Sequence, residues 1–184
     1  MEHAYPEAMK NSAFTKRFSA LWSTNMGVSL TRVAAMVGRD LTIDDVELHD
    51  WAQGEFAKHV SGLDFALAQA ANVEFRRAVQ QWWHDGWDLL VSPTLAEPPT
   101  RIGEFANNHD QPMAPMIRAS QIVAFTPAFN SSGQPAISLP MHWTPEGLPV
   151  GVQLVAAYGR EDVLIRVASQ LEAAQPWAHR RPSI

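Results

Sequence analysis

Seven histidines and three lysines are the side chains with which this sequence could most readily bind a metal or move protons, and none stands in a recognised catalytic pattern. No two histidines combine helical ligand spacing with a neighbouring carboxylate. His49 follows Asp45 on one predicted helix face, but such a lone pair is typical of a solvated surface. Asp44, Asp45 and Glu47 open a predicted helix, where carboxylates interact favourably with the helix dipole. We therefore expect no metal ion, no cofactor and no paired-carboxylate catalysis.

Nucleophilic catalysis also lacks its local signatures in this sequence. There is no Gly-x-Ser-x-Gly elbow, no phosphate-binding glycine loop and no His-Glu-x-x-His motif. The absence of cysteine excludes a thiolate nucleophile and disulfides. The most distinctive segment is FTPAFNSSGQPAISLP, residues 125–140. Its residue types predict a tight loop that feeds a buried hairpin, with Gly133 at a positive φ and Pro135 at the entry to a strand.

Composition places the chain among globular proteins and excludes several partners. Its 184 residues are 46% hydrophobic and 18% charged, with a net charge of −5. No run is rich in lysine or arginine, so we expect no nucleic-acid partner. The first residues are polar and acidic, unlike a secretory signal, and the apolar runs are too short to span a membrane. We therefore expect a soluble cytoplasmic protein with no membrane partner.

Hydrophobic periodicity predicts two helical segments in the first half of the chain. The first covers residues 13–37 and ends at Gly38, as helices often do at glycine. The second covers residues 43–84. It starts after Thr42, which Asp45 follows three residues later, and this spacing is a helix-start signal. An unbroken helix of that length is unusual in a globular protein, so a bend is expected near Gly54 or Gly62.

The second half predicts strands and a final helix. Strands are expected at residues 88–92, 136–143 and 150–156. The first of them reads as buried on both faces, and the last two as a hairpin joined by the turn TPEG. Residues 94–115 are expected to form a proline-rich surface loop. A short helix is expected at residues 116–124 and a closing amphipathic helix at residues 161–173.

The distinctive segment and its continuation GLPVGVQLVAAYGRED resemble the C-terminal hallmark of the amidase signature family. WDLLVSPT resembles the preceding strand of those enzymes, and LEAAQPWAHRRP resembles their last helix and tail. In the helical half, AYPEA, LTIDDVE and WW-x-x-GWDLL are similar to the nylon-oligomer amidases of the family. The resemblance covers nearly the whole chain. It implies an α/β fold with helices on a mixed central sheet, incomplete in this chain, in which residues 1–86 are mainly helical and residues 87–184 carry the strands, the hallmark and the final helix.

The family resemblance implies amide chemistry whose machinery lies elsewhere. Amidase-signature enzymes hydrolyse non-peptide amides with a Ser–cis-Ser–Lys triad in the N-terminal portion of a longer chain. Here Ser131 and Ser132 lack the Gly-Gly-Ser-Ser-Gly context of the nucleophile, and Lys10, Lys16 and Lys58 do not match the position of the base. We expect a C-terminal fragment of an amide hydrolase, with no catalytic residue and no activity by itself.

Such a fragment would still supply sheet and pocket wall. The resemblance implies that Trp22 and Met26, one turn apart, and Phe125 and Thr126, at the start of the hallmark, contact substrate. Core packing is the alternative for Trp22 and Met26.

The expected partners are a small amide in the full-length context, an N-terminal amidase half or a second copy. The alternative function is a non-catalytic module, derived from an amidase, that binds a small molecule or a protein. Alone, the chain should expose apolar surface and an unpaired strand edge.

Overall fold

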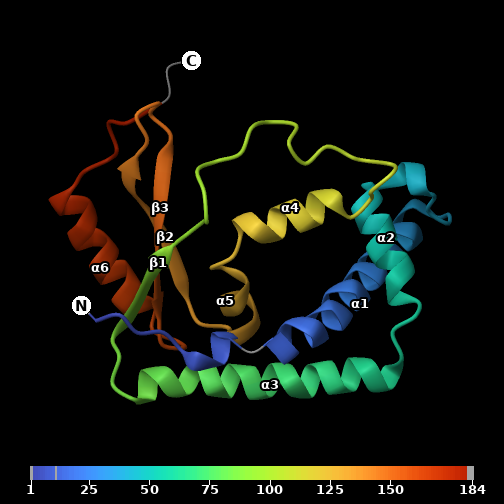
Figure 1. The fold of residues 1–184 in the computed structure, drawn as a ribbon, viewed down its shortest axis with the longest axis horizontal. Coiled ribbons are helices and arrows are strands. Elements are labelled where there is room, and N and C mark those ends of the chain that lie inside the picture. Colours follow the sequence, from blue (N-terminus) through green and yellow to red (C-terminus); the bar gives the residue numbers. More distant parts are fainter. Residues whose placement is uncertain (1, 11, 182–184) are drawn as a thin grey trace. The chain divides into compact units, whose positions relative to one another are not determined.

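A computed structural model describes residues 2–10 and 12–181, and for residues 12–16 it describes the backbone alone (Figure 1). The chain folds into two compact units. The sheet unit comprises Met1–Met9, Arg76–Thr100 and Ile122–Ile184, and the helical unit comprises Lys10–Phe75 and Arg101–Gln121.

The helical unit contains the predicted helices, with the second one divided. Its main elements are α1 (Ser12–Val37), α2 (Leu48–Ala57) and the first part of α3 (Gly62–His84). As predicted, α1 ends at Gly38, which has a φ of 72°. The predicted bend near Gly62 is confirmed, because α3 begins there, whereas Gly54 lies inside α2.

A polar cap explains why the helical segment breaks where it does. The backbone N–H of Ser61 donates to the Asp64 carboxylate at 3.1 Å, and the Asp64 N–H donates to Ser61 Oγ at 3.1 Å. This reciprocal pair satisfies backbone donors that the first turn of α3 would otherwise leave without partners. The hydrogen bonds from the Ser61 hydroxyl and N–H hold the pKa of Asp64 below its ordinary value.

Helices α1 and α2 approach closely because small residues line their contact. Ser23 Oγ donates to Gln53 Oε1 at 3.1 Å, and both side chains are buried. A Cβ on Gly27 would lie 3.0 Å from the Ala57 Cβ, which is nearer than most carbon contacts. The sequence does not predict this contact, because both positions lie within helical patterns.

The sheet unit is organised around three antiparallel strands in the order β1-β3-β2, counted over the described residues. The strands are β1 (Leu89–Pro93), β2 (Ala136–Trp143) and β3 (Pro149–Ala156). The predicted β2–β3 hairpin is confirmed, and in its turn the Gly147 N–H donates to the Thr144 carbonyl at 2.9 Å. Gly147 has a φ of 86°, a conformation that favours glycine. The predicted α/β class is confirmed.

Helix α6 (Glu161–Ala174) packs on one face of this sheet, as Figure 1 shows. The buried core between them consists of Leu139, Leu154, Ala156 and Leu164. The prediction that the first strand is buried on both faces is wrong, because Val91 in the middle of β1 is 45% exposed. A continuous apolar run did not distinguish a strand covered on two faces from a strand covered on one.

Apolar surface is exposed on several elements, as expected for this chain taken alone. Met36 near the end of α1 is 85% exposed, and Leu63 at the start of α3 is 69% exposed. Trp22, Val33 and Val37, which belong to the apolar stripe that predicts α1, are 45%, 41% and 53% exposed, so this stripe is partly open to solvent. Among the described residues, no helix combines the length and the apolar character needed to cross a membrane.

Candidate functional site

The hallmark segment, residues 125–140, begins with a short helix that the sequence analysis did not predict. Residues expected to form a tight loop form α5 (Pro127–Ser132), with Pro127 in the first turn, where its missing N–H costs nothing. Six residues are too few for hydrophobic periodicity to identify. Gly133 ends α5 with a φ of 82°, and its N–H donates to the Phe129 carbonyl at 2.8 Å. The predicted positive φ at Gly133 is confirmed.

Phe125 and Thr126 are half-buried at the start of the hallmark. The Phe125 carbonyl accepts a hydrogen bond from Gln153 Nε2 at 3.4 Å, and the same amide nitrogen donates to Ser92 Oγ at 3.1 Å. The Thr126 hydroxyl donates to the Val123 carbonyl at 3.4 Å. The backbone at the mouth of the hallmark is therefore tied to the sheet through Gln153.

Trp22 and Met26 lie on α1 in the helical unit. Trp22 is 45% exposed, and its ring centroid lies 5.8 Å from that of Phe18, while Met26 is half-buried. An indole this exposed does not fit simple core packing in this chain. The structure brings Trp22 and Met26 together on one helix and Phe125 and Thr126 together on the hallmark, and a role in substrate binding stays a prediction for all four.

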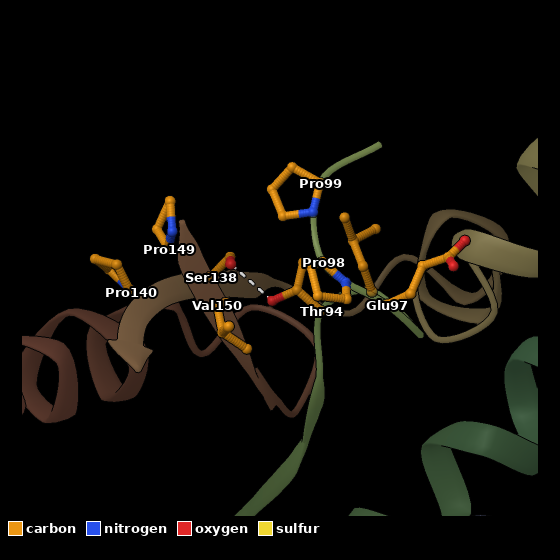
Figure 2. Close-up of a pocket in the computed structure, with 10 residues that line it drawn as sticks. Thr94, Glu97, Pro98, Pro99, Ser138, Pro140, Pro149 and Val150 are labelled. Carbon is orange, nitrogen blue, oxygen red and sulfur yellow. Dashed lines mark hydrogen bonds between the residues drawn. The ribbon is translucent and has the colours of Figure 1, made fainter. Parts of the chain in front are cut away.

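A pocket of about 310 Å³ opens on the sheet unit, where β1 ends and β3 begins (Figure 2). Gly151 of β3 lies at its base, between Thr94 and Ser138. The Thr94 and Ser138 hydroxyl oxygens are 2.7 Å apart, and the Thr94 N–H donates to the Gly151 carbonyl at 3.1 Å. Leu95, Glu97, Pro98, Pro99, Pro140, Pro149 and Val150 form its walls.

Gly151 is the residue that makes room for this hydroxyl pair. A Cβ at position 151 would lie 2.7 Å from both the Thr94 and the Ser138 hydroxyl oxygens and 3.1 Å from the Thr94 Cβ. Thr94, Ser138 and Gly151 lie within the motifs that resemble the amidase signature family, but the sequence predicts no role for them. A glycine inside a mostly apolar strand is the signal that could have identified the close approach.

The hydroxyls of Ser131 and Ser132 do not form an open nucleophilic site. Both oxygens are buried on α5 without a hydrogen-bond partner among the described residues. Nearby in the sequence, Gln134 is buried, and its amide nitrogen donates to Gln80 Oε1 at 2.9 Å. A nucleophile must reach a carbonyl carbon from solvent or from a pocket, so buried hydroxyls support the expectation that neither serine is catalytic.

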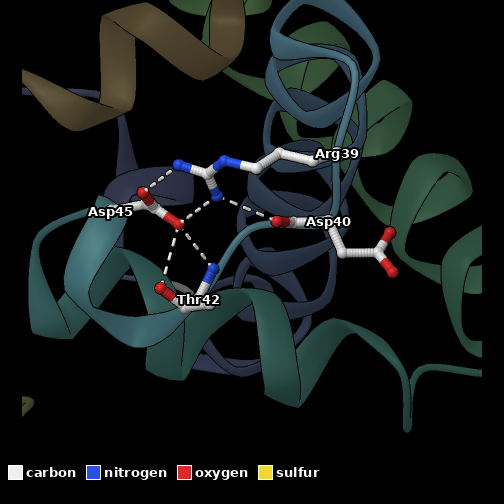
Figure 3. A network of polar contacts seen from close by, with 4 residues as sticks. All are labelled: Arg39, Asp40, Thr42 and Asp45. Carbon is white, nitrogen blue, oxygen red and sulfur yellow. Dashed lines mark hydrogen bonds and ion pairs between the residues drawn. The ribbon is translucent and has the colours of Figure 1, made fainter.

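Among the residues that the structure describes, the largest pKa shift belongs to a surface network in the helical unit, not to a pocket (Figure 3). The Arg39 guanidinium donates to both Asp45 carboxylate oxygens, at 2.7 and 2.8 Å. The Thr42 N–H and hydroxyl donate to the same carboxylate at 2.7 and 2.9 Å. The hydrogen bond from Arg39, followed by those from Thr42, holds the pKa of Asp45 well below its ordinary value. This network caps a short 3-10 helix, Ile43–Asp45, and the prediction that the second long helix starts at residue 43 is wrong, because α2 begins at Leu48.

The histidine, acidic and lysine side chains that the structure describes are the candidates for metal ligands or for a base. In the part of the chain that the structure describes, no group of three histidine or acidic side chains could hold a metal ion. His49 Nε2 lies 3.2 Å from the carboxylate of its neighbour Asp50. The Lys58 ammonium pairs with Glu55 at 2.6 Å, and the Lys16 side chain lies outside the described residues.

Comparison with known proteins gives consistent matches. The amidase family model matches residues 4–165. The chain is 42% identical over 186 residues to the 6-aminohexanoate-cyclic-dimer hydrolase of Paenarthrobacter ureafaciens. The aligned region covers 98% of this chain and 38% of that protein. A protein of the same name from Pseudomonas sp. (strain NK87) is 41% identical with the same coverage. The chain thus spans 38% of the length of these curated relatives.

Solved structures agree with the sequence matches. A 6-aminohexanoate cyclic dimer hydrolase complexed with substrate has a TM-score of 0.89 at 40% identity, over 99% of this chain and 39% of that chain. A bacterial aryl acylamidase of the amidase signature family has a TM-score of 0.68 at 19% identity, over 100% of this chain and 39% of that chain. At that identity the second match shows the fold alone.

Proposed function

The chain belongs to the amidase family, and from that premise we propose that it is the C-terminal portion of an amide-bond hydrolase of the Ser–cis-Ser–Lys type. In this proposal it contributes sheet and pocket wall, and the residues that attack the amide lie outside these 184. The observation that carries the proposal is the match over 98% of this chain but 38% of the curated relative. The buried Ser131 and Ser132 hydroxyls support it, because neither of these two serines can reach an amide carbonyl from solvent.

The proposed substrate is a small aliphatic amide. The relatives that match over almost the whole chain are named as hydrolases of 6-aminohexanoate cyclic dimer, which contains amide bonds within a hydrocarbon framework. Trp22 and Met26 on α1 and Phe125 and Thr126 at the hallmark are proposed to contact the acyl part of the substrate. The exposed indole of Trp22 supports this role, since large aromatic side chains are common in ligand pockets.

The proposed partner in catalysis is an N-terminal amidase portion that supplies the serines and the lysine. Val91 on the edge strand β1 is exposed, and apolar side chains on α1 are exposed as well. An N-terminal portion could bury this apolar surface by packing against it. Assembly with a second copy of the chain is the alternative arrangement. The proposal keeps the cytoplasmic location expected from the sequence.

A chimera tests this function directly. The matched region of the Paenarthrobacter relative would be replaced by this chain, and hydrolysis of 6-aminohexanoate cyclic dimer would be followed by release of amine. The purified chain and the remaining part of the relative serve as separate controls. We expect turnover by the chimera and none by either part. Turnover by the chain alone would overturn the proposal.

A non-catalytic binding module is the second candidate, because residues of this chain alone line the pocket at Thr94 and Ser138. A folded chimera that never hydrolyses amides, together with amide binding by the chain, would favour that candidate over the hydrolase fragment.

A further inference from the structure

The end of the β2–β3 hairpin that carries the turn, from Pro140 to Gly151, offers fewer backbone donors than a regular antiparallel pair. Pro140 and Pro149 lie on the two strands at this turn end, and neither has an N–H to donate. A bulge between Pro140 and His142 places Met141 outside the paired register. The ladder between the strands therefore holds the turn end weakly, and contacts from other segments should determine how often it opens.

The segment after α6, residues 175–180, runs back to this turn end (Figure 1). Trp177 anchors the segment, because it is half-buried and packs against the core between α6 and the sheet. Gln175 Nε2 donates to the Met141 carbonyl at 3.2 Å, so the bulged residue receives a hydrogen bond from the segment. The Arg180 N–H donates to the Trp177 carbonyl at 2.9 Å. This hydrogen bond makes a turn that carries the end of the segment over the hairpin.

The last contact of the segment is a guanidinium over an aromatic ring. The Arg180 Cζ atom lies 4.1 Å from the centroid of the Trp143 ring. A cation at this distance is attracted by the electron-rich face of the indole, which is the most favourable ring for this interaction. Trp143 is the last residue of β2, and its register partner is Pro149. The contact therefore joins the C-terminal segment to the last strand pair before the turn.

The same strand pair contributes to the pocket beside Gly151. Pro140, Pro149, Val150 and Gly151 of the turn end line that pocket, as Figure 2 shows for three of them. A separation of β2 from β3 at the turn end would move Pro149 and its neighbours relative to the remaining lining residues. Contacts that hold the turn end therefore also hold this side of the pocket.

We propose that residues 175–180 form a strap that holds the turn end of the hairpin closed, and that release of Arg180 from Trp143 loosens the pocket wall at Val150. Trp177 is the firm part of the strap, since it packs in the core. The Arg180 side chain is exposed, so its contact can break without unfolding the sheet. The strap is thus a conformational device of the fold, independent of the proposed hydrolase function.

Hydrogen exchange of the 15N-labelled full chain tests the strap. The N–H of Thr144 reports on the turn end, because it donates to the Leu148 carbonyl at 2.9 Å. The N–H of Ala156 reports on the opposite end of the hairpin, where it donates to the Pro135 carbonyl at 3.1 Å. A local opening raises the exchange rate of Thr144 alone, whereas a loss of global stability raises both rates.

Arg180→Gln removes the cation and keeps a polar side chain. It should raise the exchange rate of the Thr144 N–H about two- to fivefold, the factor that corresponds to one exposed cation–π contact, and leave that of Ala156 unchanged. The amide signal of Val150 should shift in the same variant. Arg181→Gln is the matched control, because it removes the same charge from the next residue, which is also exposed. It should change neither the exchange rates nor the signal.

A double-mutant cycle tests whether the ring is the partner of the cation. Trp143→Leu removes the ring and keeps an apolar side chain in β2. In this background Arg180→Gln should have no further effect on the exchange rate of Thr144. An equal effect in both backgrounds would mean that Arg180 acts on the hairpin in another way, and would overturn the proposal.

Three other results would also overturn it. In the folded Arg180→Gln variant, either the exchange rate of Thr144 or the Val150 signal could stay as in the wild type. Arg181→Gln could raise the Thr144 rate as much as Arg180→Gln does. The rates of Thr144 and Ala156 could rise by the same factor. The assay involves no substrate, so each result stands whether or not the chimera hydrolyses amides.

Discussion

Gly151→Ala changes the molecule by one methyl group at the base of the pocket. The added carbon would lie 2.7 Å from the hydroxyl oxygens of Thr94 and Ser138. It would also lie 3.1 Å from the Cβ of Thr94. The side chains of Thr94 and Ser138 must therefore separate, or β3 must shift away from its neighbours. Either movement breaks the 2.7 Å contact between the two hydroxyls.

The size of the effect follows from three contributions. Loss of the hydroxyl hydrogen bond costs about 1 kcal/mol. Crowding one methyl group into a filled site costs about 1–3 kcal/mol. Alanine restricts the unfolded chain more than glycine does, which offsets about 0.4–1 kcal/mol. The expected net loss in the free energy of unfolding is about 1–3 kcal/mol.

Urea unfolding of the chain, followed by far-ultraviolet circular dichroism, measures this loss. Gly62→Ala is the matched control, because Gly62 begins α3, its φ is not left-handed, and no atom lies within 4 Å of its added Cβ. That variant should keep the wild-type stability or gain up to about 1 kcal/mol. In a Ser138→Ala background, Gly151→Ala should cost less, because one of the two clashing oxygens is gone.

A Gly151→Ala variant that is as stable as the wild type, with an unchanged denaturant slope, would refute this reasoning. It would mean that the hydroxyls move apart without cost, and that the glycine is not needed for the pocket.

Three further predictions concern the elements that support the site. Asp45→Asn should destabilise the chain at pH 7. Because Arg39 lowers the pKa of Asp45, the stabilisation is present above the ordinary aspartate pKa and is lost as the pH falls through the lower folded value. The two stability curves should therefore begin to approach each other below about pH 4 and draw closer as the pH falls further. Ser61→Ala should lower the free energy of unfolding by about 1 kcal/mol through loss of the α3 cap, and circular dichroism should show reduced helix content at intermediate urea. Leu164→Ala should lower the free energy of unfolding by about 2–5 kcal/mol, because Leu164 is 4% exposed in the core. Its neighbour Ile165 is 64% exposed, so Ile165→Ala should change this free energy by less than about 0.5 kcal/mol in the same unfolding assay.

The sequence predicted those elements whose pattern is long enough to be read locally. Helix α1, its end at Gly38, the β2–β3 hairpin and helix α6 follow from hydrophobic periodicity and turn residues. The resemblance to the amidase signature family is confirmed by the family match and by relatives that cover nearly the whole chain. That resemblance rested on motifs, because periodicity alone does not distinguish one α/β family from another.

Features that depend on contacts distant in the sequence were not predicted. Thr94 and Ser138 belong to different strands or their ends, and their hydroxyl contact exists because β1 and β2 both pair with β3. The exposure of Val91 likewise depends on what covers the sheet, which a strand pattern does not specify. Helix α5 was missed because it is short and its glycine-proline surroundings are typical of a loop.

Intact-mass analysis of the purified chain after incubation with phenylmethanesulfonyl fluoride tests the central claim most directly. An activated serine reacts with this sulfonyl fluoride to form a stable ester, whereas an ordinary or buried hydroxyl does not. If these residues supply only sheet and pocket wall, the mass of the chain stays unchanged and the chimera gains one adduct. A stoichiometric adduct on a serine of the chain alone would contradict the account.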